Sequence, residues 1–417
     1  MVLSLLPILA QAISLTAGDV SESRLRFDGL GQHVDLVTTG QVALQVDFRR
    51  TNWVLAYSPS IIQVNVGEAD SAPMSQHMGN LAGTLRLSKR TTLTWSESAM
   101  YGRMNLRAQA VSGQQPVASN SGTSSGSVSS QPGSTATGSA PSNPVGGQPG
   151  SQVLAAPGNP TINYGAIASG AGIDYKLGKK WSARAFAGYT ISGELDSQSP
   201  VVIPRARAIF GTESMAYELS KRDGVTFTST DRYTLINPGA KAGVYTLNAG
   251  WNRIINRWSG MYLFAGESYF NSTDLTGKQS TGVLPLLGAA LTLEKAYHSA
   301  GGLMITVGAS VAPMTDYLTG ATSEMAATNV TAKWTQDRLS FQVLEYGASS
   351  VGHYGYSALS AIYSISEIVT YQLDRRQHWS ATMGSRQAEQ VFSNGSPQQM
   401  LWTAFLGVAY TTAPIPM

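Results

Sequence analysis

The chain of 417 residues contains no cysteine and carries little charge. Without cysteine it can form no disulfide, no thiolate metal site and no cysteine nucleophile. Asp, Glu, Lys and Arg make up 13% of the residues, against about 25% in a typical soluble protein. The formal net charge of +3 is too small to indicate a nucleic-acid partner.

Long hydrophobic runs are also missing. No stretch of 18 apolar residues is present that could form a membrane-spanning helix. The chain is nevertheless rich in glycine and tyrosine, with 43 Gly and 18 Tyr. This composition is typical of strands that are apolar on one face and small or polar on the other, as in bacterial outer-membrane barrels.

Recognisable catalytic motifs are absent too. The sequence has no nucleotide-binding loop, HExxH helix, GxSxG elbow or acidic calcium loop. Two of its five histidines, His298 and His378, lie in or beside basic turns, and His33, His77 and His353 fall in predicted outer loops. We therefore expect no enzymatic activity, no catalytic residue, no metal and no cofactor. An outer-membrane hydrolase that uses the three loop histidines is the least favoured alternative.

A short basic turn recurs along the chain between two runs of alternating apolar and polar residues. Successive turns are separated by 40, 90, 42, 36, 38, 43 and 37 residues. An interval of about 40 residues fits two strands, one tight turn and one longer loop, the unit of an up-and-down β-meander. The first basic residues of the turns are Arg49, Lys89, Lys179, Lys221, Arg257, Lys295, Arg338 and Arg375.

The strands between these turns alternate clearly enough to assign faces. Val42, Leu44 and Val46 share one face, while Ala43 and Gln45 share the other. The second face is mostly Ser, Thr, Gly, Asn and Gln in the strands that follow. In a soluble sandwich the exposed face would carry many Lys and Glu, so lipid outside and water inside explain the pattern better.

Three acidic residues break the alternation. Glu97, Glu345 and Glu367 fall on the apolar face of their strands. We expect a bulge, a change of register or a strand end above the bilayer at these places.

These observations predict an all-β fold, a single closed antiparallel up-and-down transmembrane barrel of about 18 strands, with 16 as the alternative. The basic turns are short, so they belong on the periplasmic side and the longer loops outside the cell. The eighteenth strand requires a first strand at residues 21–30, ahead of the first hairpin.

The barrel sequence is flanked and interrupted by segments of other character. Residues 1–12 resemble a signal peptide, with an apolar stretch and an Ala-Gln-Ala cleavage site. The basic residues that usually come before the apolar stretch are missing. Residues 107–160 are rich in Ser, Gly and Pro, and are predicted to form a long extracellular loop. Barrel strands occupy residues 13–106 and 161–412, followed by a tail at 413–417.

The turns and one further stretch resemble a known class of proteins. Residues 50–59 (Arg-Thr-Asn-Trp-Val-Leu-Ala-Tyr-Ser-Pro) and the Tyr-x-Leu-Ser-Lys-Arg type of turn at 217–222 are similar to porin-like outer-membrane β-barrel proteins of Gram-negative bacteria, of the myxobacterial type. The resemblance covers nearly the whole chain outside 107–160. It implies an outer-membrane barrel, but such barrels serve as pores, receptors, adhesins and enzymes.

Charged residues on the inner face would determine which solutes pass. Arg205 and Arg207, if they point inward, would form a rim that attracts anions. The predicted pore-lining residues are Asp47, Arg86, Asp174, Arg184, Arg205, Arg207, Arg232, Lys333 and Arg386.

Two functions follow from this interpretation. The favoured one is a passive channel for small hydrophilic solutes or ions. The alternative is a structural or surface-recognition barrel with a closed lumen and a long extracellular loop. The expected partners are outer-membrane lipid, lipopolysaccharide, the barrel-assembly machinery and small solutes or ions, with no nucleic acid; the oligomeric state stays open.

Overall fold

The computed structural model describes residues 12–28, 31–68, 71, 73–105, 161–195, 203–297, 301–316, 319–354, 359–374, 378–392, 399–413 and 415–416. The predicted signal peptide, apart from Ala12, and the predicted loop at 107–160 lie outside these ranges. In the described ranges there are only strands, turns and bends, and no helix that is long and apolar enough to cross a bilayer.

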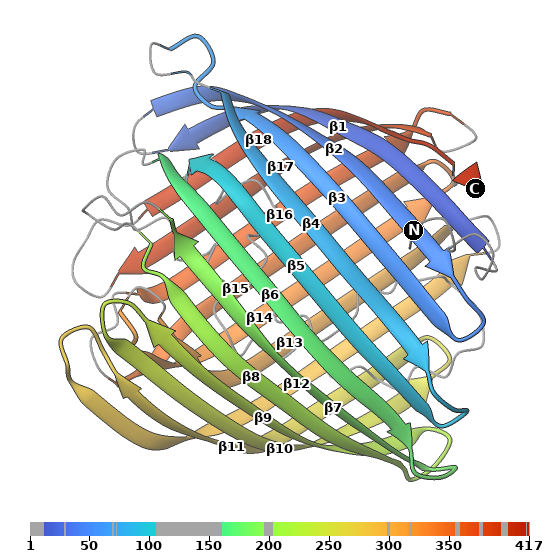
Figure 1. Ribbon diagram of the computed structural model, residues 1–417, viewed down its shortest axis with the longest axis vertical. Coiled ribbons are helices and arrows are strands. Elements are labelled where there is room, and N and C mark those ends of the chain that lie inside the picture. Colours follow the sequence, from blue (N-terminus) through green and yellow to red (C-terminus); the bar gives the residue numbers. More distant parts are fainter. Residues whose placement is uncertain are drawn as a thin grey trace, which may run out of the picture.

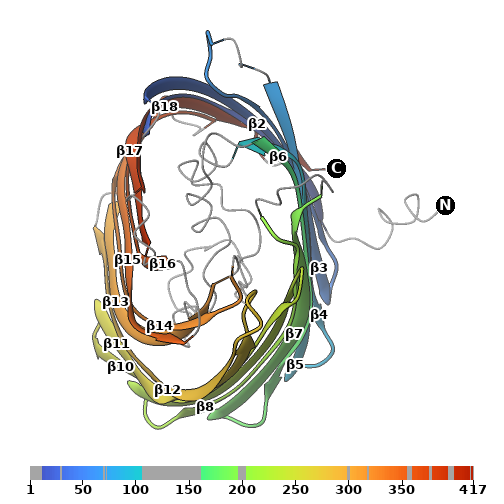
Figure 2. The same cartoon turned by 90° about the vertical axis from the view of Figure 1, so that its left-hand side faces the viewer.

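Eighteen long antiparallel strands form one closed sheet (Figures 1 and 2). Each strand pairs with its neighbours in the chain, and β18 pairs with β1 to close the ring. The strands are β1 (Ala12–Asp28), β2 (Gly31–Asp47), β3 (Thr51–Gln63), β4 (Pro73–Arg86), β5 (Thr91–Asn105), β6 (Thr161–Lys176), β7 (Trp181–Glu194), β8 (Ala206–Glu218), β9 (Asp223–Ile236), β10 (Ala240–Asn256), β11 (Ser259–Thr273), β12 (Gln279–Tyr297), β13 (Gly301–Thr315), β14 (Thr322–Gln336), β15 (Leu339–Tyr354), β16 (Leu359–Gln372), β17 (Trp379–Phe392), β18 (Gln399–Thr411) and the short β19 (Ile415–Pro416).

The predicted strand count of 18 is confirmed, as is the all-β closed antiparallel barrel. The first strand is longer than expected, because β1 starts at Ala12 instead of residue 21. The tail also contributes, since β19 pairs with Ser14 and Leu15 of β1. Lys295 lies within β12, so this basic residue precedes its turn.

The apolar faces predicted from the alternation lie on the outside of the barrel. Ile209 and Leu247 are 68% and 65% exposed there, and Ile209 lies between the outward-facing rings of Tyr189 and Tyr233. Near the basic turns, aromatic rings meet across neighbouring strands: Trp181 lies 4.5 Å from Tyr217, and Trp379 lies 4.7 Å from Tyr410. An apolar belt bordered by aromatic rings is the surface that a lipid bilayer requires.

The three acidic exceptions remain on this outer face. The pairing of Glu97, Glu345 and Glu367 with both neighbouring strands is continuous. The described register shifts lie elsewhere, at Ile254/Asn256, Glu324/Met325 and Leu359/Ala361. The predicted bulge or register change at the three acids is therefore wrong, and none of them lies at a strand end. Glu213 and Glu267 also face outward in the middle of their strands.

The inner face is divided along the barrel axis. In the half near the longer loops, inward-facing side chains are buried: Tyr164 of β6 and Phe270 of β11 are 1% and 0% exposed. In the half near the basic turns, inward-facing side chains such as Asp174 and Ser182 remain accessible. We call the first half the narrow section and the second half the vestibule.

Packing in the narrow section is mainly apolar. Its clusters include Val244, Phe270 and Leu284 on β10–β12, and Met314 and Met325 on β13–β14. These residues alternate with the outer apolar residues, so their strands carry apolar side chains on both faces. The sequence pattern had predicted a small or polar inner face throughout.

Candidate functional site: the inner wall

The vestibule contains five of the predicted pore-lining residues, and two of them form an ion pair across neighbouring strands. Asp174 and Arg184 lie directly opposite each other on β6 and β7, with Arg184 Nε 3.5 Å from the Asp174 carboxylate. Both side chains are more than a third exposed. Asp47 accepts hydrogen bonds from Gln45 and Asn52 beside the first basic turn. Arg86 pairs with Thr92 on the inner face.

Lys333 completes this group on the opposite side of the ring. It faces inward between Met304 of β13 and Gln342 of β15, close to the turn end of β14. The vestibule therefore presents charges of both signs on accessible side chains. Such a wall can attract water and small ions but has no fixed geometry for one ligand.

Arg232 and Arg386 belong to the narrow section. Arg232 is buried on β9, and its Nε donates to Thr234 Oγ1 at 3.4 Å. Arg386 on β17 donates to Glu22 of β1 at 3.2 Å. Its guanidinium also lies over the ring of Phe405, 4.0 Å from the centroid, a cation–π contact that fixes its orientation.

The structure does not bring Arg205 and Arg207 to the pore. Arg205 precedes β8 and donates to the backbone oxygens of Glu194 and Leu195, at 2.9 and 2.7 Å. Arg207 lies opposite Ile191, on the same outer face as Ile209.

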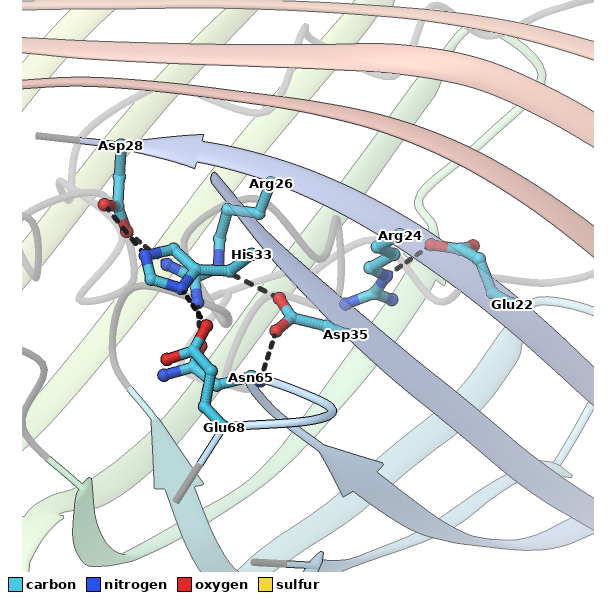
Figure 3. A network of polar contacts seen from close by, with 8 residues as sticks. All are labelled: Glu22, Arg24, Arg26, Asp28, His33, Asp35, Asn65 and Glu68. Carbon is cyan, nitrogen blue, oxygen red and sulfur yellow. Dashed lines mark hydrogen bonds and ion pairs between the residues drawn. The ribbon is translucent and has the colours of Figure 1, made fainter. Parts of the chain in front are cut away.

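A charged cluster that the sequence did not predict lies on the inner wall of β1 and β2 (Figure 3). Its centre is Arg26, which is fully buried. Arg26 donates to Asp35 at 2.9 Å and to Asn65 at 2.8 Å, and it also contacts Asp28. The members drawn in Figure 3 are Glu22, Arg24, Arg26, Asp28, His33, Asp35, Asn65 and Glu68.

The cluster also holds the segment that follows β3 against the wall. Asn65, in a left-handed backbone conformation with φ 56°, donates its N–H to Asp35 at 3.1 Å. The N–H of Val66 donates to the Val34 carbonyl, and His33 lies 2.8 Å from Glu68. Because buried charges are tolerated only when they are paired and hydrogen-bonded, these contacts make the segment part of the wall.

A signal for this cluster was present in the sequence. Glu22, Arg24, Arg26 and Asp28 follow one another at every second position, which places all four on one face of a strand. A strand facing lipid on that side could not carry four charges, so the charged face had to point inward. The partner residues Arg386 and Asn65 could not be identified, because they depend on ring closure and on the path of a loop.

The predicted positions of the loop histidines are corrected by the structure. His33 lies on the inner face of β2, and His353 lies within β15. His77 lies on the outer face of β4, where its Nδ1 is 2.7 Å from the hydroxyl of Tyr57. Among the residues that the structure describes, no three His, Asp or Glu side chains are grouped so that they could hold a metal ion.

Solved outer-membrane porins resemble this barrel at low sequence identity. OpdL of Pseudomonas aeruginosa is 11% identical, with 96% of this chain and 98% of that chain covered and a TM-score of 0.44. A BenF-like porin from Pseudomonas fluorescens Pf-5 is 11% identical, with 98% and 100% covered and a TM-score of 0.47. OccAB3 of Acinetobacter baumannii is 9% identical, with 96% and 99% covered and a TM-score of 0.43. No curated protein matches the sequence.

The closed ring, the apolar belt and its aromatic borders together define an integral outer-membrane β-barrel. The sequence also matches one family model over residues 28–406, which spans the barrel from the end of β1 to the middle of β18. The chain therefore belongs to the EpsX exopolysaccharide export family.

Proposed function

We propose that the barrel is a conduit through which an exopolysaccharide chain crosses the outer membrane. The observation that carries this proposal is the family match over residues 28–406, because that family is described by exopolysaccharide export. The architecture is compatible with such a role. A hydrated chain needs a path lined by groups that can replace water, and the inner wall supplies hydroxyls, amides and charges while the outer face meets lipid.

In this proposal the two halves of the inner face have different roles. The vestibule, with exposed Asp174 and Arg184, would accept the chain from the periplasmic side. The narrow section would then bring every sugar close to the wall. The proposed pore-lining residues of the vestibule are Asp47, Arg86, Asp174, Arg184 and Lys333, and those of the narrow section are Arg232 and Arg386.

The direct test is made in cells. Deleting the gene that encodes this protein should abolish polysaccharide on the cell surface, and expression of the wild-type protein should restore it. Sugar analysis of washed cells measures the surface polysaccharide. An unchanged amount after deletion of the gene would contradict the proposal.

A second test uses the absence of cysteine. Thr228 of β9 faces inward, and Ala249 of β10 faces outward and is exposed. Thr228→Cys and Ala249→Cys would each be coupled to a thiol-reactive polymer and reconstituted into liposomes loaded with a fluorescent oligosaccharide. Efflux should stop only for the modified Thr228→Cys. Equal efflux through both modified proteins would show that the lumen is not the path.

The passive channel for small solutes or ions is the second candidate. The mixed, accessible charges of the vestibule favour it, since they suit ions better than a single ligand. It predicts discrete conductance steps in planar bilayers at neutral pH, and conductance without any effect on surface polysaccharide would select it over export.

A further inference from the structure

Two basic side chains face outward at the loop end of the adjacent strands β8, β9 and β10 (Figure 1). Arg207 of β8 and Lys241 of β10 both lie directly opposite Leu235 of β9, one on each side of it. All three side chains are exposed. Because neighbouring strands are about 4.8 Å apart, the backbones of the two cations are about 10 Å apart. We call Arg207, Leu235 and Lys241 the outer basic patch.

The strand register gives the depth of this patch in the bilayer. Tyr217 of β8 and Trp251 of β10 face outward near the basic turns, where aromatic rings border the apolar belt. Arg207 lies ten residues from Tyr217 along its strand, and Lys241 lies ten residues from Trp251. Ten residues of a strand tilted by about 40° rise about 25 Å, which is the height of the apolar band of an outer-membrane barrel. The patch therefore lies at the other border of the band, among the lipid headgroups of the outer leaflet.

Neither cation of the patch is neutralised within the protein. The side chains of Arg207 and Lys241 form no hydrogen bond and no ion pair with the part of the chain that the structure describes. The carboxylates at the same end of β7 and β11, Glu194 and Asp274, are buried, at 6% and 3% exposure. The nearest acid on the outer face of β8–β10 is Asp231, four residues deeper on β9, which is about 13 Å along the strand. Salt in the headgroup water largely screens a charge at that separation.

The outer face below the patch suits lipid chains. Ile209 and Leu247 are among its most exposed side chains. Tyr189 and Tyr233 lie on either side of Ile209, one strand position below the cations. Tyrosine rings at this level can pack on acyl chains while their hydroxyls reach the polar headgroups. The complementary ligand is therefore a lipid with negative charges at its headgroup.

The pairing of two cations distinguishes this part of the rim. Within the described strands, one other Lys or Arg faces outward in the loop half of the barrel, which is Arg103 of β5. It lies opposite Asn163 of β6, and no second Lys or Arg faces outward at this end of β4 or β6. Arg103 thus provides a single cation at similar depth, against which the pair can be compared.

We propose that the outer basic patch is a binding site for a diphosphorylated glycolipid of the outer leaflet, the lipid A part of lipopolysaccharide. Its two phosphates are separated by the length of a disaccharide, so each can accept charge-assisted hydrogen bonds from one cation. Leu235 lies between them, and the acyl chains pack on the apolar face below. This binding occurs on the outside of the barrel, so it is independent of what crosses the lumen.

The test is equilibrium binding to the full-length barrel in detergent, measured by native mass spectrometry. The probes are diphosphorylated lipid A, the same lipid without its phosphates, phosphatidylglycerol and inorganic phosphate. Diphosphorylated lipid A should bind about tenfold or more tightly than the dephosphorylated lipid, because hydrogen bonds to charged groups are lost with the phosphates. It should also bind more tightly than phosphatidylglycerol, and inorganic phosphate should not displace it.

Each other result of the probe comparison counts against the inference. Equal binding of the dephosphorylated lipid would overturn the site. Equal binding of phosphatidylglycerol would overturn the choice of a glycolipid with two phosphates. Displacement by inorganic phosphate would overturn a lipid as the ligand.

Variants locate the site on the barrel. Arg207→Gln and Lys241→Gln should each weaken binding of diphosphorylated lipid A by about fivefold or more, and Arg207→Lys should retain most of it. Arg103→Gln is the matched control and should leave binding unchanged. An equal loss in Arg103→Gln, or no loss in the two patch variants, would overturn the location. If a patch variant fails to fold, the probe comparison on wild-type protein still decides.

Discussion

The vestibule and the narrow section are built from the same strands, yet their side chains meet very different surroundings. In the vestibule, the Asp174–Arg184 pair is more than a third exposed. In the narrow section, the Arg26–Asp35 pair is almost completely buried and is held by Asn65 as well. Water screens the first pair and not the second, so similar residues contribute very differently to stability.

Charged side chains therefore have different roles in the two halves of the lumen. Accessible charges in the vestibule attract ions without ordering them. Buried charges in the narrow section must be paired within the wall. Four substitutions test the comparison, in order of decreasing effect.

The largest effect is expected from Asp35→Ala in the narrow section. It leaves Arg26 buried with fewer partners and removes the acceptor of the Asn65 N–H. The free energy of unfolding should fall by about 3–5 kcal/mol, the usual cost of an uncompensated buried charge. Urea unfolding in lipid vesicles, followed by tryptophan fluorescence, measures it. A loss below 1 kcal/mol would mean that the cluster is hydrated.

Phe270→Ala tests the apolar part of the same section. Phe270 is fully buried against Val244 and Leu284, so its truncation should leave a cavity and cost about 3–5 kcal/mol, at the lower end if neighbours relax. The same unfolding assay applies. The control is Phe227→Ala on the outer face, where the ring is exposed; similar losses for both would contradict a packed inner wall.

Glu213→Leu tests the acids on the outer face. Glu213 is exposed in the middle of β8, opposite Ala185 and Ser229, where hydrocarbon disfavours a charge. The variant should be more stable than wild type by about 1 kcal/mol. Glu218→Leu, at the turn end of the same strand, should bring no gain. Destabilisation by Glu213→Leu would indicate a polar partner at this face.

The smallest effect is expected from Asp174→Ala in the vestibule. Because the pair with Arg184 is exposed, its loss should change the free energy of unfolding by less than about 1 kcal/mol. Ion selectivity should shift toward anions, since a negative charge is removed from the wall. Reversal potentials in asymmetric salt would show this shift, and a large loss of stability would break the distinction between the two halves.

The sequence was sufficient to predict the strand number and the outer face, because both depend on a period of two and on the spacing of the turns. Trp181, Leu247 and Trp379 follow that pattern strictly. Depth along the barrel axis has no periodic signal. Nothing in the alternation separates an inward-facing Asp174 that is accessible from an inward-facing Tyr164 that is buried.

The charged cluster was missed for a related reason. The pattern Glu22, Arg24, Arg26, Asp28 is local, but its partners are not: Arg386 lies 364 residues from Glu22. Outward-facing acids such as Glu367 break the alternation, but the register shift expected from that break is absent, because the pairing on both sides is continuous. The missed cluster and the wrongly expected register shift have the same cause. The sequence pattern describes one strand at a time, whereas both features depend on contacts between strands.

The meeting of Glu22 with Arg386 has a consequence for biogenesis. Every other strand can find its neighbour within one hairpin, but this ion pair forms only when the last strands reach the first one. Long-range contacts of this kind come late in folding. Glu22, which already contacts Arg24 on its own strand, therefore gains its second arginine only when the carboxyl-terminal hairpin seals the cylinder.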